Sequence, residues 1–232
     1  MWIDDQVLRE CHQQLVYQSW VPSELMVVLG RSNQAELEAE VERCDKDGVA
    51  ILKRYGGGGT VLLHPGCLVV SVGAWVDSPY QNDLYFRLLN DSIITTIQDQ
   101  LPVELGQRGY SDIVFGERKI AGTSLFRSRQ YLLYQASVLI NDRIDEIETY
   151  LKHPSKEPDY RKARKHRDFL SCLEEIQSMT HASPVLSAKD WAAHFEKSFF
   201  GHLKNKLAPH IKEPMEAHIP HLLKRVSVHA EV

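Results

Sequence analysis

The spacing of apolar residues along this chain changes several times between the period of a strand and that of a helix. Short apolar runs bounded by Gly, Pro or polar residues predict strands at 15–20, 25–29, 49–54, 60–63, 68–76, 103–105, 112–115, 118–121 and 132–140. Helical spacing predicts helices at 4–14, 34–47, 83–100, 142–151, 159–177 and 187–206. Since the two types do not alternate regularly, the pattern favours an α+β fold with mixed β-sheets flanked by helices.

The clearest helical pattern lies near the end of the sequence. Trp191, Phe195, Phe199 and Leu203 repeat at four-residue intervals. Because residues four apart lie on the same side of a helix, these side chains form one apolar face that has to be buried. The pattern predicts that the helix at 187–206 packs against the core.

The composition is that of a soluble globular protein. Of the 232 residues, 43% are hydrophobic and 25% are charged, and the formal net charge is −4. A dedicated nucleic-acid-binding domain is usually strongly basic, so the composition argues against this class. No stretch approaches the roughly 18 apolar residues of a membrane span, and no signal peptide is visible. We therefore expect a cytoplasmic protein without nucleic-acid or membrane partners.

The cysteines are widely separated, at Cys11, Cys44, Cys67 and Cys172, and none forms a Cys-x-x-Cys pair. This spacing indicates neither a zinc site nor a disulfide framework, and reduced thiols are the simplest interpretation. A thiol close to a histidine can be a nucleophile, and Cys67 closely follows His64. Cys67 also begins an apolar run, which favours a packed thiol instead.

Four consecutive glycines at 56–59 are the most unusual feature of the sequence. Their exposed amides can form a concave nest for an anion, and Lys53 and Arg54 place positive charge beside it. The run lacks the Gly-Lys-Ser/Thr ending and the following helix of a Walker loop. A conformational bulge is an equally good interpretation, because glycine suits any turn with a positive φ.

A lysine and an aspartate flank a second glycine-bounded segment. Lys119 lies in a short strand after the turn expected at 116–117, and Asp112 lies just before it. Such a lysine is either a solvated edge charge or a compact cation that holds a phosphate together with a carbonyl oxygen. Asp112 is either a turn residue or, near a triphosphate, a ligand for Mg²⁺.

The segment 152–167 is rich in lysine and arginine. The default interpretation is the solvated face of the helix expected there. The alternative is a surface that docks an acidic partner protein, whose association complementary charge would speed.

Four segments together resemble the lipoate–protein ligase family. Residues 28–34 are similar to its Gly-Arg-x-x-Gln segment, and 54–61 with His64 to its Arg-Arg-x-x-Gly-Gly-Gly-x-Val-x-His loop. Residues 112–122 are similar to its hairpin ending in Gly-Arg-Lys-Ile-Ser-Gly, and 134–140 to its His-His-Gly-Thr-Leu-Leu strand. Order and spacing agree over most of the chain, which makes the combination more specific than any single motif.

The resemblance implies an α+β catalytic domain shared with biotin ligases and related to class II aminoacyl-tRNA synthetases. It implies that ATP and Mg²⁺ activate lipoate or octanoate as an acyl-adenylate, and that the acyl group then passes to a lysine of an acceptor lipoyl domain. Such acceptors are dehydrogenase-complex subunits or a protein like the glycine cleavage H protein. We expect one catalytic domain over 1–232 without a separate C-terminal accessory domain, and an accessory subunit is a possible partner.

The resemblance also assigns roles to residues. It implies that Lys119 is the catalytic cation, which contacts the adenylate phosphate and the acyl carbonyl. It implies that Asp112 is the carboxylate on the side of Mg²⁺. The residues implied to bind ATP and the acyl substrate, besides Lys119, are Arg54, Gly57, Gly58, Gly59, His64 and Gly122.

The sequence departs from the family pattern at several positions. Ser111 replaces the usual Asn, Ala121 replaces the usual Ser, and Tyr134, Gln135 and Ala136 stand in place of His-His-Gly. These changes affect the residues that shape the nucleotide site and the acyl site.

Two other functions are compatible with the same fold. An octanoyl or lipoyl transferase would take the acyl group from a carrier protein through a cysteine thioester, without ATP. A non-catalytic protein would bind lipoate or an acyl-adenylate. Because no cysteine lies near the 112–122 hairpin and Cys67 is the only near candidate, the sequence favours the ligase.

Overall fold

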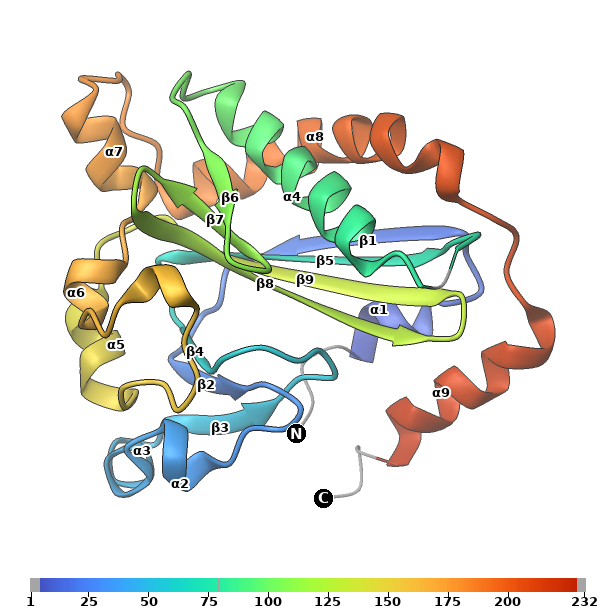
Figure 1. The fold of residues 1–232 in the computed structure, drawn as a ribbon, viewed down its shortest axis with the longest axis horizontal. Helices are drawn as coiled ribbons and strands as arrows, with labels where there is room; N and C mark the ends of the chain where they lie inside the picture. Colours follow the sequence, from blue (N-terminus) through green and yellow to red (C-terminus); the bar gives the residue numbers. More distant parts are fainter. Residues whose placement is uncertain (1–4, 79, 229–232) are drawn as a thin grey trace.

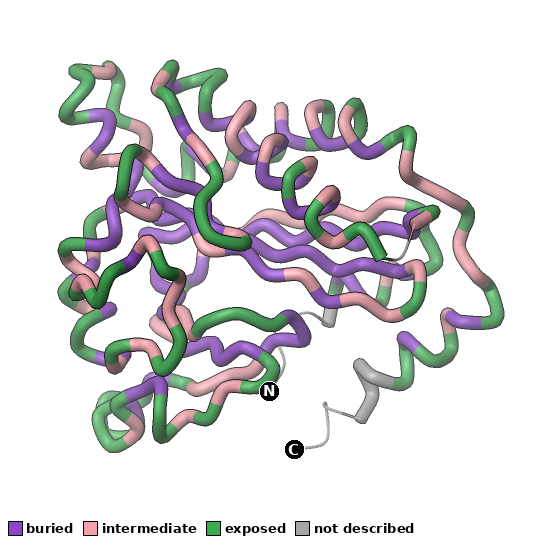
Figure 2. The backbone as a smooth tube through the Cα atoms, viewed as in Figure 1, coloured by how far each residue is buried: buried purple, intermediate pink, exposed green. Residues whose placement is uncertain are grey.

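The computed structural model describes residues 5–78 and 80–228, and a six-stranded antiparallel sheet forms its centre (Figure 1). The strand order is β1-β5-β9-β8-β7-β6. The bounds are β1 (Leu15–Trp20), β5 (Cys67–Trp75), β9 (Tyr131–Leu139), β8 (Arg118–Ser128), β7 (Asp112–Phe115) and β6 (Gly106–Arg108). All nine residues of β5 are buried (Figure 2). A continuous apolar run is expected of a strand whose two faces are both covered.

Two long helices cover one face of this sheet, as Figure 1 shows: α4 (Asn82–Gln98) and α8 (Ala188–Leu207). The prediction of an apolar helix face is confirmed, because Trp191, Phe195, Phe199 and Leu203 are buried in the main core. Ser187 begins α8 with a capping box, in which its side chain and that of Asp190 satisfy each other's backbone amides.

A smaller sheet lies on the opposite face of the large one (Figure 1). Its strand order is β3-β2-β4, in which β2 is parallel to β3 and antiparallel to β4. The strands are β2 (Met26–Leu29), β3 (Ala50–Lys53) and β4 (Val61–Leu63). A small apolar cluster joins the sheets, since Val28 and Leu63 of the small sheet pack with Val69 of β5. The glycine run connects β3 to β4 and lies at this junction.

Short helices complete the fold. The α-helices are α1 (Asp5–Arg9), α2 (Ala35–Glu38), α3 (Val41–Asp47), α5 (Ile144–Tyr150), α6 (His166–Phe169), α7 (Leu173–Met179) and α9 (Ile219–Val228). The 3-10 helices are η1 (Asp159–Arg161), η2 (Ala208–His210) and η3 (Glu216–His218). Among the described residues, no helix is long and apolar enough to cross a bilayer. The predicted α+β class, with sheets flanked by helices, is confirmed.

The single helix predicted at 159–177 is wrong. Lys162 and Ala163 have positive φ values of 53° and 56°, which end η1. Leu170 then forms a parallel bridge with Lys119, and the amide of Ser171 donates to the Lys119 carbonyl at 2.9 Å. This pairing with a distant strand keeps the chain extended between α6 and α7. The basic segment 152–167 is therefore mostly an irregular loop rather than a helix face.

Other predicted elements differ from the structure in position or length. The strand predicted at 103–105 is wrong. Residues 101–105 form a loop whose Leu101 and Leu105 side chains are buried in the core, and β6 begins only at Gly106. The helix predicted at 34–47 is two helices, because Ala39 is extended and forms a bridge with Leu151. The strand predicted at 118–121 continues to the end of β8, the helix predicted at 4–14 is confined to α1, and α9 was not predicted.

Candidate active site

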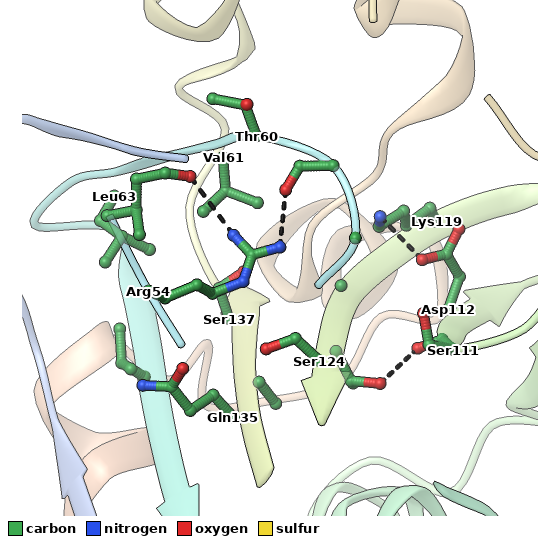
Figure 3. Close-up of a pocket in the computed structure, with 17 residues that line it drawn as sticks. Arg54, Thr60, Val61, Leu63, Ser111, Asp112, Lys119, Ser124, Gln135 and Ser137 are labelled. Carbon is green, nitrogen blue, oxygen red and sulfur yellow. Dashed lines mark hydrogen bonds and ion pairs between the residues drawn. The ribbon is translucent and has the colours of Figure 1, made fainter. Parts of the chain in front are cut away.

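Two adjoining chambers open between the glycine run and the face of β8 and β9 on the side of the small sheet, and Figure 3 shows residues that line the first of them. The first chamber is lined on one side by Val28, Val61, Leu63, Val69 and Ala136. The second chamber is larger, about 320 Å³ against about 100 Å³. Lys119, Asp112 and Gly122 line both chambers and mark the place where they meet.

A β-bulge turns Lys119 toward this junction. In the pairing of β7 with β8, Asp112 lies opposite Gly122, and Val114 lies opposite Lys119, so that Ile120 is the extra residue. Regular alternation would place residues 119 and 122 on opposite faces, but the bulge places both on the face of Asp112. Ile120 is fully buried in the main core. The burial of Ile120 in the core thus fixes β8 at the residue next to Lys119.

The ammonium group of Lys119 is paired with Asp112. Nζ lies 2.8 Å from Oδ1 of Asp112, and the hydroxyl of Tyr160 donates to Oδ2 at 2.8 Å. Burial and the adjacent carboxylate raise the pKa of Tyr160, so this phenol stays protonated and remains a donor. The segment before α6 therefore fixes the carboxylate that holds the lysine.

The space for the ammonium group depends on a glycine. A Cβ atom at Gly122 would lie 2.9 Å from Nζ of Lys119 and 3.0 Å from its Cε. Any side chain at this position would push the lysine from its place beside Asp112. Gly122 thus lines the site by its lack of a side chain.

Arg54 holds the glycine loop through the carbonyl groups of that loop. Its Nη2 atom donates to the carbonyl oxygens of Gly57 and Gly59, both at 2.7 Å, and Nη1 donates to the carbonyl oxygen of Val28 at 3.3 Å. Figure 3 shows the Arg54 side chain among the residues of the first chamber. Within the described chain, the amides of Gly57, Gly58 and Gly59 donate no hydrogen bond. A guanidinium group that binds carbonyls leaves amides of the same loop available for an anion.

His64 lies apart from the other predicted site residues. It is fully buried, it lines neither chamber, and its Nδ1 accepts a hydrogen bond from the amide of Gly66 at 3.0 Å. Burial lowers its pKa to about 4, and the charge of Arg143 acts in the same direction. In this structure His64 holds the turn after β4 through its bond to the Gly66 amide.

The chain was compared with known proteins. The family model of the lipoyl protein ligase A/B catalytic domain matches residues 1–200. The chain belongs to this ligase family. Lipoate-protein ligase A subunit 1 of Thermoplasma acidophilum is 29% identical over 141 residues, which are 56% of this chain and 53% of that protein. The chain therefore spans about half the length of the curated relative that it matches.

Solved structures of ligases share the fold. The structure of the bi-partite lipoate protein ligase of Thermoplasma acidophilum superposes on 99% of this chain, and the match covers 90% of the ligase chain. The TM-score is 0.70 and the sequence identity is 16%. A lipoate-protein ligase A bound with ATP matches 97% and 87%, with a TM-score of 0.71 and 18% identity. At such low identity the likeness concerns the fold. The family expected from the sequence motifs is confirmed.

The ligase site contains residues that sequence reasoning missed. Tyr160 contacts Asp112, and Arg161 and His166 line the second chamber. All three residues lie in the basic segment 152–167. The sequence favoured a solvated helix face there, because a continuous helix was expected at 159–177. Gln135, one of the departures from the family pattern, also lines the first chamber.

The cysteines of this ligase-family chain are poor nucleophiles. All four are buried, and none lines either chamber. Burial raises the pKa of Cys67 to about 12 and that of Cys172 to about 11. The thiolate is the reactive form, so these thiols are almost wholly unreactive near neutral pH. The prediction that Cys67 is a packed thiol is confirmed.

The buried His64 predicts how stability depends on pH. The unfolded chain binds a proton at this side chain near pH 6.5, whereas the folded chain does so only near pH 4. The free energy of unfolding should therefore fall as the pH is lowered through this window, with at most about 3 kcal/mol from this residue. Urea unfolding of wild type and His64→Gln at several pH values measures the difference. Parallel pH profiles for the two proteins would contradict the assignment.

Proposed function

We propose that this chain is the catalytic part of an ATP-dependent lipoate–protein ligase. It activates lipoate or octanoate as an acyl-adenylate and transfers the acyl group to a lysine of an acceptor lipoyl domain. The observation that carries this proposal is the position of Lys119, which lines both a chamber with an aliphatic wall and a larger chamber with three further cationic side chains. A lysine at such a junction can contact an acyl carboxylate on one side and a phosphate on the other.

Each chamber suits one part of the substrates. The first chamber has an aliphatic wall from Val28, Leu63 and Val69, which matches the hydrocarbon chain of a fatty acyl group. The second is lined by Lys152, Lys156 and Arg161, which match the triphosphate. We assign the acyl chain to the first chamber and the nucleotide to the second.

The two steps follow from this arrangement. A carboxylate oxygen of the acyl substrate bonds to the α-phosphorus of ATP, and the bond to the pyrophosphate oxygen breaks, so that pyrophosphate leaves. Lys119 offsets the negative charge that the carboxylate and phosphate bring together. The neutral amine of the acceptor lysine then attacks the acyl carbon, AMP leaves, and the new amide loses a proton. Lys119 acts again, on the oxygen that becomes negative during this attack.

Asp112 is the proposed carboxylate for Mg²⁺. A carboxylate has about four lone-pair positions, of which Lys119 and Tyr160 use two. The remaining positions fit a Mg²⁺ ion that takes one protein carboxylate and completes its shell with phosphate oxygens and water. Such an ion would neutralise phosphate charge.

The related structures support the choice of partners. One is described as a bi-partite lipoate protein ligase and its E2 lipoyl domain, and the curated relative is a subunit of a ligase. By analogy, we propose a lipoyl domain as the acceptor and a second subunit as a partner of this chain. The buried cysteines count against the thioester transferase, which needs a reactive thiol in the site.

ATP–pyrophosphate exchange tests the proposal. We expect the purified chain, alone or with its second subunit, to exchange labelled pyrophosphate into ATP only when lipoate or octanoate is present. Cys67→Ser should exchange at the wild-type rate, because its thiol is buried outside the chambers. Absence of exchange, together with an acyl thioester trapped on Cys67, would replace the ligase by the transferase.

A further inference from the structure

Arg161 is a buried cation with an unpaired amino group, Nη2. It is 5% exposed, and its Nη2 atom has no hydrogen-bond partner among the described residues. The rest of the guanidinium group is fixed, since Nε donates to the carbonyl of Arg164 at 3.0 Å and the group stacks on Phe169 at 4.7 Å. Glu157 lies 3.5 Å from Nε. The side chain is thus held in one orientation with a donor left over.

A buried charged donor without an acceptor is costly. The loss of its hydration is then not offset by a hydrogen bond within the protein. Burial lowers the pKa of Arg161, but a guanidinium group stays charged at neutral pH. A fold that keeps this arrangement beside a cavity is typical of a site where a ligand supplies the missing acceptor.

The charges of the second chamber indicate an anionic ligand. Lys119, Lys152, Lys156 and Arg161 line it, whereas its lining carboxylates are Glu38 and Asp112. Both carboxylates are already engaged, Glu38 by the hydroxyl of Ser155 and Asp112 by Lys119 and Tyr160. His166 adds no positive charge, because burial lowers its pKa to about 4. The four lining cations outnumber the two lining carboxylates, so the chamber favours an anionic ligand.

The place of Arg161 selects which phosphates it contacts. It lines only the second chamber, whereas Lys119 lines both. The α-phosphate has to lie at the junction, where the acyl carboxylate reaches it. We propose that Arg161 binds the β- and γ-phosphates of ATP and thereby holds the pyrophosphate leaving group. This assignment rests on the proposed function, and it adds a leaving-group contact on the loop before α6.

Direct binding of inorganic pyrophosphate tests the assignment without requiring activity. Titration calorimetry should show pyrophosphate binding to wild type that weakens at least about tenfold in Arg161→Met, as expected when a charge-assisted contact is lost. Lys162→Gln removes one charge from the same loop at an exposed position outside the chambers and should bind as wild type does. Arg161→Lys keeps the positive charge but loses the planar guanidinium group with its paired donors. Its pyrophosphate affinity should lie between those of wild type and Arg161→Met.

Each outcome is decisive. Equal pyrophosphate affinity in wild type and Arg161→Met would overturn the assignment, as would an equal loss in Lys162→Gln, which would indicate a general charge effect. Thermal unfolding without ligand identifies a misfolded variant, and in that case Arg161→Lys decides the question.

In exchange assays the loss of Arg161 should raise the KM for ATP and leave the KM for lipoate unchanged. Arg161-dependent pyrophosphate binding in a protein that shows no exchange would keep the phosphate site and reject the ligase.

Discussion

Lys119→Ala should reduce acyl-adenylate formation and acyl transfer by at least about 100-fold while leaving the fold intact. Removal of one donor that stabilises developing charge has effects of this size in other enzymes, and Lys119 serves both steps in the proposed mechanism. The side chain is partly exposed at the chamber junction, so its loss leaves no cavity in the core. ATP–pyrophosphate exchange measures the first step, and transfer from synthetic lipoyl-adenylate to an acceptor domain measures the second.

Lys165→Ala is the matched control for this variant. Lys165 is an exposed lysine that lines neither chamber. It should retain wild-type rates in both assays, and circular dichroism should show native structure for both variants. Near-normal turnover of Lys119→Ala would remove the lysine from the centre of the mechanism.

Gly30→Ala is expected to have the second largest effect, because Gly30, the residue after β2, lies against the glycine loop. A Cβ atom at this position would overlap the carbonyl oxygen of Gly58 and lie 2.5 Å from Oδ1 of Asn33. Gly58 has a φ of +93°, a conformation that favours glycine, so its backbone has little freedom to move aside. The loop has to shift away from Arg54. We expect a loss of about 1–3 kcal/mol of stability, as for other overpacked sites, and at least a tenfold drop in exchange.

Gly57→Ala provides the comparison within the same loop. A Cβ atom at Gly57 meets no atom within 4 Å, and its φ is not positive. This variant should keep native stability and most of the exchange activity. If Gly30→Ala and Gly57→Ala behave alike in unfolding and exchange, the loop does not depend on this close contact.

The sequence predicted the local elements of the fold better than its long-range pairings. The apolar face of α8 and the turn at Gly116 follow from residues that are close together in the chain. The loop at 151–165 does not, because Leu170 pairs with a strand that lies far away in sequence. A basic run with helical spacing looks the same whether it forms a helix or a loop. Only tertiary contacts decide between these outcomes.

The candidate site was predicted only in part, because some of its residues come together through long-range contacts that the sequence does not show. Motifs indicated Lys119, Asp112 and the glycine run, and the structure brings the first two to one pair of chambers together with Gly58 and Gly59, whereas Gly57 lines neither chamber. The roles of single residues depend on contacts that motifs do not contain. His64 is buried beneath a turn, and Arg161 lines the second chamber from the end of η1, where Lys162 and Ala163 have positive φ values.

The burial of all four cysteines has a practical consequence. Maleimide dyes react with accessible thiols, so the native protein should take up almost no label and needs no cysteine-free background. Tyr110 is 64% exposed and lines the second chamber. A single thiol introduced there would carry a fluorophore to the rim of the nucleotide side. Ligand binding and acceptor docking would then be followed optically in real time in an otherwise unmodified chain.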